Sequence, residues 1–292
     1  MNQLWRSLPA PALVLGGIVS VQLGAGIAKG LFDQMPPSAV VFMRLLTSTV
    51  ILGILARKLI RTWLPRIDRA GTMVLVGFGL SLATMNFAIY QSFSRIPLGI
   101  AVTIEFLGPL GVSVAFSRRR IDVAWVALAA LGVLLLTRGS ADDLDPVGVI
   151  FALVAAAGWA AYILLSVETG RRFEGSSGLA VASTVGMVVV APIGLVEGGA
   201  QMWQPHLVAV AVAVGLLSSA IPYTLELEAL RRIPAKTFGI LMSLEPVVAA
   251  MVGLILLGEI LQLREWAAIG CVVLACIGAV RTNPRPQEAP EA

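Results

Sequence analysis

Two glutamates, Glu105 and Glu245, lie in the middle of long apolar segments of the sequence. A charged side chain at the centre of a bilayer costs about 2.5–3.5 kcal/mol on insertion scales, so it must face other helices or a water-filled cavity. Each glutamate precedes a proline, Pro109 or Pro246. Because a proline donates no backbone hydrogen bond, the carbonyls of Glu105 and Met242 lose their helical partners, which predicts a bend in each helix. A carboxylate beside such a bend is a candidate site for an ammonium group or a proton.

A purely structural interpretation is also open for these residues. Each glutamate would then make a hydrogen bond to a neighbouring helix, and each proline would only kink its own helix. The two interpretations differ in whether the carboxylates face a shared cavity.

Two basic residues with apolar neighbours, Lys29 and Arg44, are candidates for binding a carboxylate. Lys29 lies near the end of the first apolar segment, so its ammonium can instead extend to the membrane surface. Arg44 lies about two turns inside the second segment, where this is harder. Its alternative role is an ion pair with a carboxylate elsewhere in the protein.

The remaining candidates are residues that either line a cavity or pack between helices. Asn86 and Tyr90 share one helix face by their spacing, as do Trp159 and Tyr162. Tyr223 follows a proline inside another apolar segment.

Two further glutamates, Glu226 and Glu228, lie close in sequence to Arg231 and Arg232. For both of them we expect ion pairs at the membrane surface.

The composition indicates which elements must position these residues. The 292 residues are 58% hydrophobic and 13% charged, whereas a soluble domain carries about 25% charged residues. A bilayer core about 30 Å thick needs about 20 apolar residues per helix. We therefore predict an all-α membrane protein with ten transmembrane helices. The predicted spans are 11–31, 37–57, 71–93, 96–116, 122–139, 146–167, 177–197, 206–228, 235–257 and 264–281.

The distribution of basic residues predicts the orientation of the spans. The chain has 21 Lys and Arg against 17 Asp and Glu. Most of the basic residues fall in loops on the same side as the amino terminus, which the positive-inside rule assigns to the cytoplasm. Both termini are therefore expected to be cytoplasmic, and the basic excess does not indicate a nucleic-acid partner.

The two halves of the chain share a pattern. Without a gap, Arg95-Ile96-Pro97 aligns with Arg232-Ile233-Pro234, and Pro109 then aligns with Pro246. Two units of five spans each would have opposite orientations in the membrane, as in many secondary transporters. We predict a first repeat over residues 1–140, a second over 141–282 and a disordered cytoplasmic tail over 283–292. The alternative is a chance match between two apolar stretches.

Enzymatic function is not indicated. The sequence has one histidine and no cluster typical of a catalytic or metal site, so we expect no cofactor and no bound metal. Cys271 and Cys276 face different sides of one helix, which argues against a disulfide. Close helix packing explains the glycines inside spans better than phosphate-binding loops do: Gly24, Gly26, Gly108 and Gly111.

Five segments make the chain recognisable: SVQLGAGIAKGLF (20–32), NFAIYQSFSRIPLGIAVTIEFLGPL (86–110), GWAAYIL (158–164), IPYTLELEAL (221–230) and TFGILMSLEP (237–246). In their order and spacing they resemble the bacterial threonine and homoserine exporter family. That family is an EamA-type branch of the drug/metabolite transporter superfamily. The resemblance implies a multi-pass carrier of the bacterial inner membrane, built from two inverted five-helix units. It also implies export of small amino acids driven by the proton gradient.

The candidate residues suit a zwitterionic substrate. Glu105 or Glu245 can accept hydrogen bonds from an ammonium group, while Lys29, Arg44 or a tyrosine hydroxyl can donate to a carboxylate. Asn86 or Tyr90 would suit a side-chain hydroxyl. Our hypothesis is that one glutamate binds a proton and the substrate ammonium in alternation, so that the two cross the membrane in opposite directions.

Two other functions remain open at the level of sequence. A related drug/metabolite carrier for a drug, a purine or an aromatic solute would have a cavity richer in aromatic side chains and no dedicated cation. A membrane scaffold that transports nothing would use Glu105 and Arg44 only to hold helices together.

Overall fold

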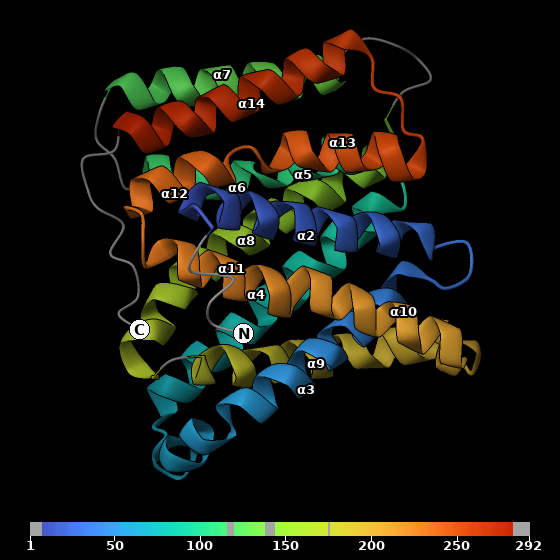
Figure 1. The fold of residues 1–292 in the computed structure, drawn as a ribbon, viewed down its shortest axis with the longest axis vertical. Helices are drawn as coiled ribbons and strands as arrows, with labels where there is room; N and C mark the ends of the chain where they lie inside the picture. The colour runs from blue at the N-terminus through green and yellow to red at the C-terminus, as the bar shows by residue number, and fades with distance from the viewer. Residues whose placement is uncertain (1–7, 116–119, 138–143, 175, 283–292) are drawn as a thin grey trace.

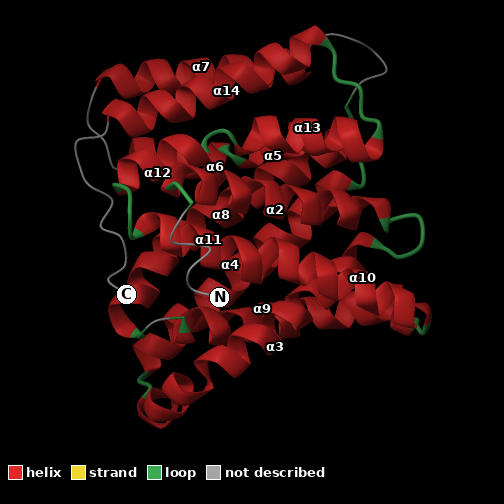
Figure 2. Cartoon of the chain, viewed as in Figure 1, coloured by secondary structure: helices red, strands yellow, loops and turns green. Residues whose placement is uncertain are grey.

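The computed structural model describes residues 8–115, 120–137, 144–174 and 176–282. The regular secondary structure of this described part is helical, without a strand, and loops join the helices (Figure 2). The predicted all-α class is therefore confirmed. The predicted tail over 283–292 lies outside the described residues.

The long helices follow the predicted spans closely. Their bounds are α2 (Ala10–Gly30), α3 (Pro37–Trp63), α4 (Arg69–Phe93), α5 (Leu98–Glu105), α6 (Leu107–Ala115), α7 (Arg120–Thr137), α8 (Pro146–Arg172), α9 (Ser177–Gly198), α10 (Pro205–Gly215), the π-helix η3 (Leu216–Ala220), α11 (Ile221–Leu230), α12 (Ala235–Met242), α13 (Glu245–Leu257) and α14 (Leu263–Thr282).

Nine helical segments of the described chain are long and apolar enough to cross a membrane. Three of these segments are joined from shorter helices: α5 with α6, α10 with η3 and α11, and α12 with α13. The predicted fifth span corresponds to α7, whose apolar helix over Ile121–Leu136 is shorter than the other nine. The chain is a multi-pass membrane protein.

Local sequence explains where several helices begin and end. Proline occupies the first turn of α3, α8 and α10, where a helix needs no proline N–H. Asp68 and Asp145 cap α4 and α8 by accepting backbone N–H groups of Gly71 and Val147. Gly258, at φ 68°, ends α13 in the left-handed conformation that glycine adopts most easily.

The helices form layers whose members come from both halves of the chain (Figure 1). Along one edge α7 packs on α14, and along the opposite edge α3 packs on α9. Between these edges α4 packs on α8, and α2 and α5 both pack on α13. We call α5 with α6 and α12 with α13 the two interrupted spans, and they meet where α5 packs on α13.

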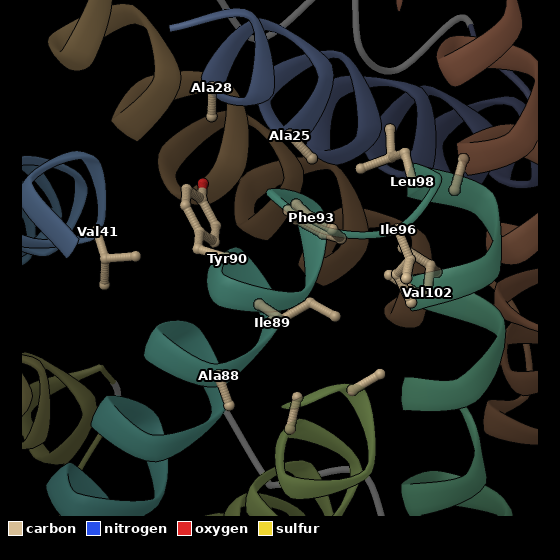
Figure 3. Close-up of a cluster of buried hydrophobic side chains, with 14 of the residues drawn as sticks. Ala25, Ala28, Val41, Ala88, Ile89, Tyr90, Phe93, Ile96, Leu98 and Val102 are labelled. Carbon is tan, nitrogen blue, oxygen red and sulfur yellow. The ribbon is translucent and has the colours of Figure 1, made fainter. Parts of the chain in front are cut away.

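A buried apolar cluster surrounds the turn from α4 into α5 (Figure 3). Tyr90 and Phe93 close α4, Leu98 and Val102 lie on α5, and Ala25 of α2 faces them across the turn. This packing fixes the direction in which α5 enters the bundle.

Most of the four glycines singled out in the sequence lie at close helix contacts. A Cβ atom on Gly24, Gly26 or Gly108 would lie within 3 Å of a neighbouring atom, whereas Gly111 has open space around it. The packing explanation is thus confirmed for three of the four glycines.

Candidate functional site

A cavity of about 320 Å³ lies between the helices of the described structure. This volume is at the lower end of the range of about 300–1,000 Å³ that is typical of small-ligand sites. Residues from both halves of the chain line it. Its polar and aromatic lining includes Gln22, Arg44, Ser48, Asn86, Tyr90, Glu105, Trp159, Tyr162, Ser183, Ser218, Ser219, Glu226 and Glu245.

Most of the residues predicted for the site meet in this cavity. Seven of them line it together: Arg44, Asn86, Tyr90, Glu105, Trp159, Tyr162 and Glu245. Pro109 and Pro246 lie at the helix interruptions next to the two glutamates. Tyr223 belongs to α11, but its side chain lies outside the part of the structure that is described. Lys29 is not part of the lining.

Glu105 is the last residue of α5 and is only 9% exposed. Phe106 separates α5 from α6, and Pro109 lies in the first turn of α6. The Phe106 ring contacts Trp159 of α8 edge to face, with 4.9 Å between ring centroids. This contact holds the interruption against α8, so the Glu105 carboxylate faces the cavity from a defined position.

Glu245 is the first residue of α13 and is 7% exposed. Gln22 of α2 donates a hydrogen bond from Nε2 to Oε1 of Glu245 over 2.8 Å. The amino terminus of a helix carries partial positive charge, which favours a carboxylate in the first turn. Glu245 is therefore held by α2 and by the start of its own helix.

Arg44 extends from α3 into the cavity and is held by neutral groups. Its guanidinium donates to Oδ1 of Asn86 and, over 3.3 Å, to the carbonyl of Ser218. It also lies over the Tyr90 ring, with 5.5 Å from Cζ to the ring centroid. No ion pair to Arg44 is found among the described residues, so the predicted alternative of a structural ion pair is not what the structure contains.

Several buried polar atoms of the lining have no hydrogen-bond partner within the described protein. These are Nε of Arg44 as a donor, Oε1 of Gln22 as an acceptor, and the hydroxyls of Tyr90 and Ser218, which can do both. Such orphaned groups are rare in native structures and call for an explanation. Here they belong to one cavity, and they match a ligand that carries both an acceptor and a donor.

Lys29 and Glu259 form an ion pair that connects the two interrupted spans, and we call this pair with its backbone contacts the Lys29 clasp. Nζ of Lys29 is 2.5 Å from Oε1 of Glu259 and donates to the carbonyl of Ile96 over 2.8 Å. Glu259, which follows α13, also accepts the backbone N–H of Leu98 at the start of α5. Lys29 is thus neither a lining residue nor a free surface lysine.

The expectation for Glu226 is wrong. Glu228 makes the ion pairs with Arg231 and Arg232, whereas Glu226 lines the cavity. The reason is helix geometry: residues 228, 231 and 232 share one face, and residue 226 lies on nearly the opposite face. A Cβ on Gly17 of α2 would lie 3.3 Å from the Glu226 side chain, so glycine there leaves room for it.

Gln22 and the serines of the lining were not among the predicted site residues. Serine and glutamine are common in apolar helices, so their sequence context carried no comparable signal. Gln22 was detectable only through the helix face that it shares with Ala25 and Lys29.

Comparison with known proteins agrees with this architecture. The model of the EamA-like transporter family matches residues 146–281. A solved crystal structure with 16% sequence identity superposes with a TM-score of 0.60, over 94% of this chain and 99% of that one. This similarity shows a shared fold.

The sequence relatives are considerably nearer. The threonine/homoserine exporter RhtA of Salmonella typhimurium (strain SL1344) is 39% identical over 285 residues, which are 96% of this chain and 95% of RhtA. RhtA of Escherichia coli (strain K12) is 38% identical over 272 residues, 92% of this chain and 90% of that protein. The uncharacterized inner membrane transporter YedA of the same strain is 25% identical over 258 residues, 84% of this chain and 82% of YedA. The chain therefore belongs to the threonine/homoserine exporter family, an EamA-type branch of the drug/metabolite transporter superfamily.

Proposed function

We propose that this protein is a secondary active exporter of small amino acids of the threonine and homoserine type. It would work by alternating access and proton antiport in the inner membrane, with both termini in the cytoplasm. The observation that carries the proposal is the cavity itself. It brings acidic groups and an orphaned acceptor together with a guanidinium and orphaned donors.

The carboxylate of the substrate would bind at Arg44. Nε of Arg44 and the hydroxyl of Tyr90 are buried donors without a partner, and a carboxylate accepts from both. Asn86 has a supporting role, because Oδ1 accepts from Arg44 and Nδ2 donates to the carbonyl of Leu82. It fixes the guanidinium rather than reading the substrate side chain.

The ammonium group would bind at the acidic side of the cavity. An ammonium group has three N–H donors, and the available acceptors are the carboxylates of Glu105, Glu226 and Glu245 and the orphaned Oε1 of Gln22. In a carrier for drugs or other cationic solutes we expect a cavity without a dedicated cation. The presence of Arg44 in the lining therefore favours an amino-acid substrate over such solutes. A scaffold would not need orphaned polar atoms around a cavity.

Proton coupling is assigned to Glu105. Glu245 already accepts a hydrogen bond from Gln22, whereas no hydrogen bond to the side chain of Glu105 or of Glu226 is found among the described residues. Of these two, Glu105 lies at a helix interruption. Glu105 is therefore free to exchange a proton for the substrate ammonium. The two interrupted spans support alternating access, because discontinuous helices form the sites of many secondary transporters.

The test is transport by purified protein reconstituted in vesicles. With a pH gradient imposed, we expect accumulation of labelled threonine and homoserine above equilibrium, and no accumulation once a protonophore removes the gradient. A panel of cationic and aromatic drugs serves as the comparison. Drug transport without amino-acid transport would overturn the assignment in favour of another drug/metabolite carrier, and the absence of any transport would favour a scaffold.

A further inference from the structure

Two serine hydroxyls form a pair in the cavity wall next to the proposed carboxylate site. Oγ of Ser48 on α3 and Oγ of Ser219 on η3 are 2.7 Å apart, and both residues line the cavity. Ser48 is 5% exposed, and Ser219 is half-buried. Nothing in the proposed binding of the ammonium and carboxylate groups uses these hydroxyls.

Both serines are tied to Arg44 by the backbone. Ser48 lies four residues after Arg44 on α3, which places it on the same helix face about 6 Å further along the axis. Ser219 follows Ser218, whose carbonyl accepts a hydrogen bond from the Arg44 guanidinium. A substrate held at Arg44 by its carboxylate therefore has the serine pair within reach of its side chain.

The local conformation that presents Ser219 is unusual. Residues Leu216–Ala220 form a π-helix inside an otherwise α-helical span, and such segments occur frequently at functional sites. Neighbouring side chains hold its carbonyls: Ser20 donates to Leu217 over 2.7 Å, and Arg44 donates to Ser218. The π-helix is thus fixed from α2 and from α3 at the residues that precede Ser219.

The pair has unused hydrogen-bonding capacity. Each hydroxyl has one donor and two acceptor positions, and the bond between the two uses one donor and one acceptor. No other hydrogen bond to either hydroxyl is found within the described residues. A third hydroxyl can therefore both donate to the pair and accept from it.

We infer that Ser48 and Ser219 recognise the side-chain hydroxyl of the transported amino acid and so determine specificity. The inference rests on the proposed function and adds to it the residues that distinguish threonine from an isosteric apolar amino acid such as valine. Because the two serines satisfy each other when the side chain lacks a hydroxyl, discrimination is modest. We expect the equivalent of one neutral hydrogen bond, about three- to tenfold in kcat/KM.

The experiment compares threonine with valine, in which a methyl group replaces the hydroxyl. Uptake of each is measured in vesicles for the wild type and for Ser48→Ala and Ser219→Ala. The expected result is that the ratio of kcat/KM for threonine to that for valine falls about three- to tenfold in each alanine variant. Ser219→Thr, which keeps a hydroxyl, should retain most of the ratio.

The matched control is Ser81→Ala. Ser81 is a buried serine of α4 outside the cavity lining, and the one hydrogen bond of its hydroxyl within the described residues is to the carbonyl of Phe78 of its own helix. An equal loss for threonine and valine in the Ser48 and Ser219 variants would show a structural role and overturn the inference. An unchanged ratio in these variants, with threonine still transported, would overturn the inference and leave the proposed function intact. Absence of amino-acid transport by the wild type would instead overturn the proposed function.

Discussion

The two interrupted spans place their glutamates on opposite sides of the break. In the first, Glu105 ends α5 and only Phe106 separates α5 from α6. In the second, α12 ends at Met242, and Glu245 begins α13 after Ser243 and Leu244. Glu245 gains the favourable amino-terminal end of a helix and a hydrogen bond from Gln22, whereas Glu105 lies at a carboxyl-terminal end, where the dipole favours cations.

This difference fits the separate roles that we propose for two positions that look alike in sequence. A carboxylate with fixed donors is suited to remain a constant acceptor for the substrate ammonium. One without fixed donors is suited to change its partner during transport.

The largest effect is expected for Glu105→Gln. The amide cannot take up and release a proton, so accumulation of threonine against its gradient in vesicles should be lost while membrane insertion is unchanged. Glu168→Gln, at an exposed ion pair on α8, is the control and should transport normally. Undiminished coupled transport by Glu105→Gln would remove Glu105 from the mechanism.

Glu245→Gln should have a smaller effect of a different kind. Loss of a charged acceptor for the ammonium group should lower kcat/KM for threonine by about 10- to 100-fold, while the response to a pH gradient persists. The measurement is threonine uptake at several imposed pH differences. If Glu245→Gln abolishes the pH response and Glu105→Gln keeps it, the assigned roles are reversed.

The contact between the two interrupted spans is open to a third test. A Cβ on Gly99 of α5 would lie 2.6 Å from Cα of Ala250 on α13, whereas Gly111 has open space. Gly99→Ala should therefore lower the free energy of unfolding by about 1–3 kcal/mol and reduce transport of both threonine and homoserine. Gly111→Ala is the matched control, and equal stability of the two variants in a thermal unfolding assay would contradict the packing argument.

The Lys29 clasp links the same two spans through a pair of charges. Lys29→Met and Glu259→Gln should each destabilise the protein, and the double variant should lose less than the two single losses combined. We expect a coupling energy of about 1 kcal/mol in a double-mutant cycle of unfolding. Additive losses would mean that the ion pair contributes nothing to stability.

The smallest effects are expected for the prolines. Pro109→Ala and Pro246→Ala restore a backbone donor to each break, and unfolding free energies should change by less than about 1 kcal/mol. Transport should nevertheless slow, more for Pro246→Ala, because a longer continuous helix would take Glu245 out of its first-turn position. Turnover measured under saturating threonine tests this order.

The sequence predicted the features that depend on local apolar context. Glu105 and Glu245 were found because charges are costly among apolar neighbours, and the breaks were found because proline lacks an N–H. Glu226 was missed because basic residues nearby in sequence offered a simpler partner, although helix spacing turns it away from them. The Lys29–Glu259 pair joins residues far apart in the chain, so only the packed bundle reveals it.

The π-helix was equally hidden, because it changes the hydrogen-bond pattern while the apolar pattern continues. The π-helix contains one residue more than the same stretch of α-helix would, and this extra residue determines how α11 is rotated about its axis relative to α10. Deleting a single residue between 216 and 220 would turn α11 by about 100° relative to α10. The Glu226 carboxylate would then leave the cavity wall for another side of the helix. The orientation of an entire half-span thus depends on one inserted residue, which makes this short stretch intolerant of length changes that ordinary helices in the same bundle would absorb at their ends.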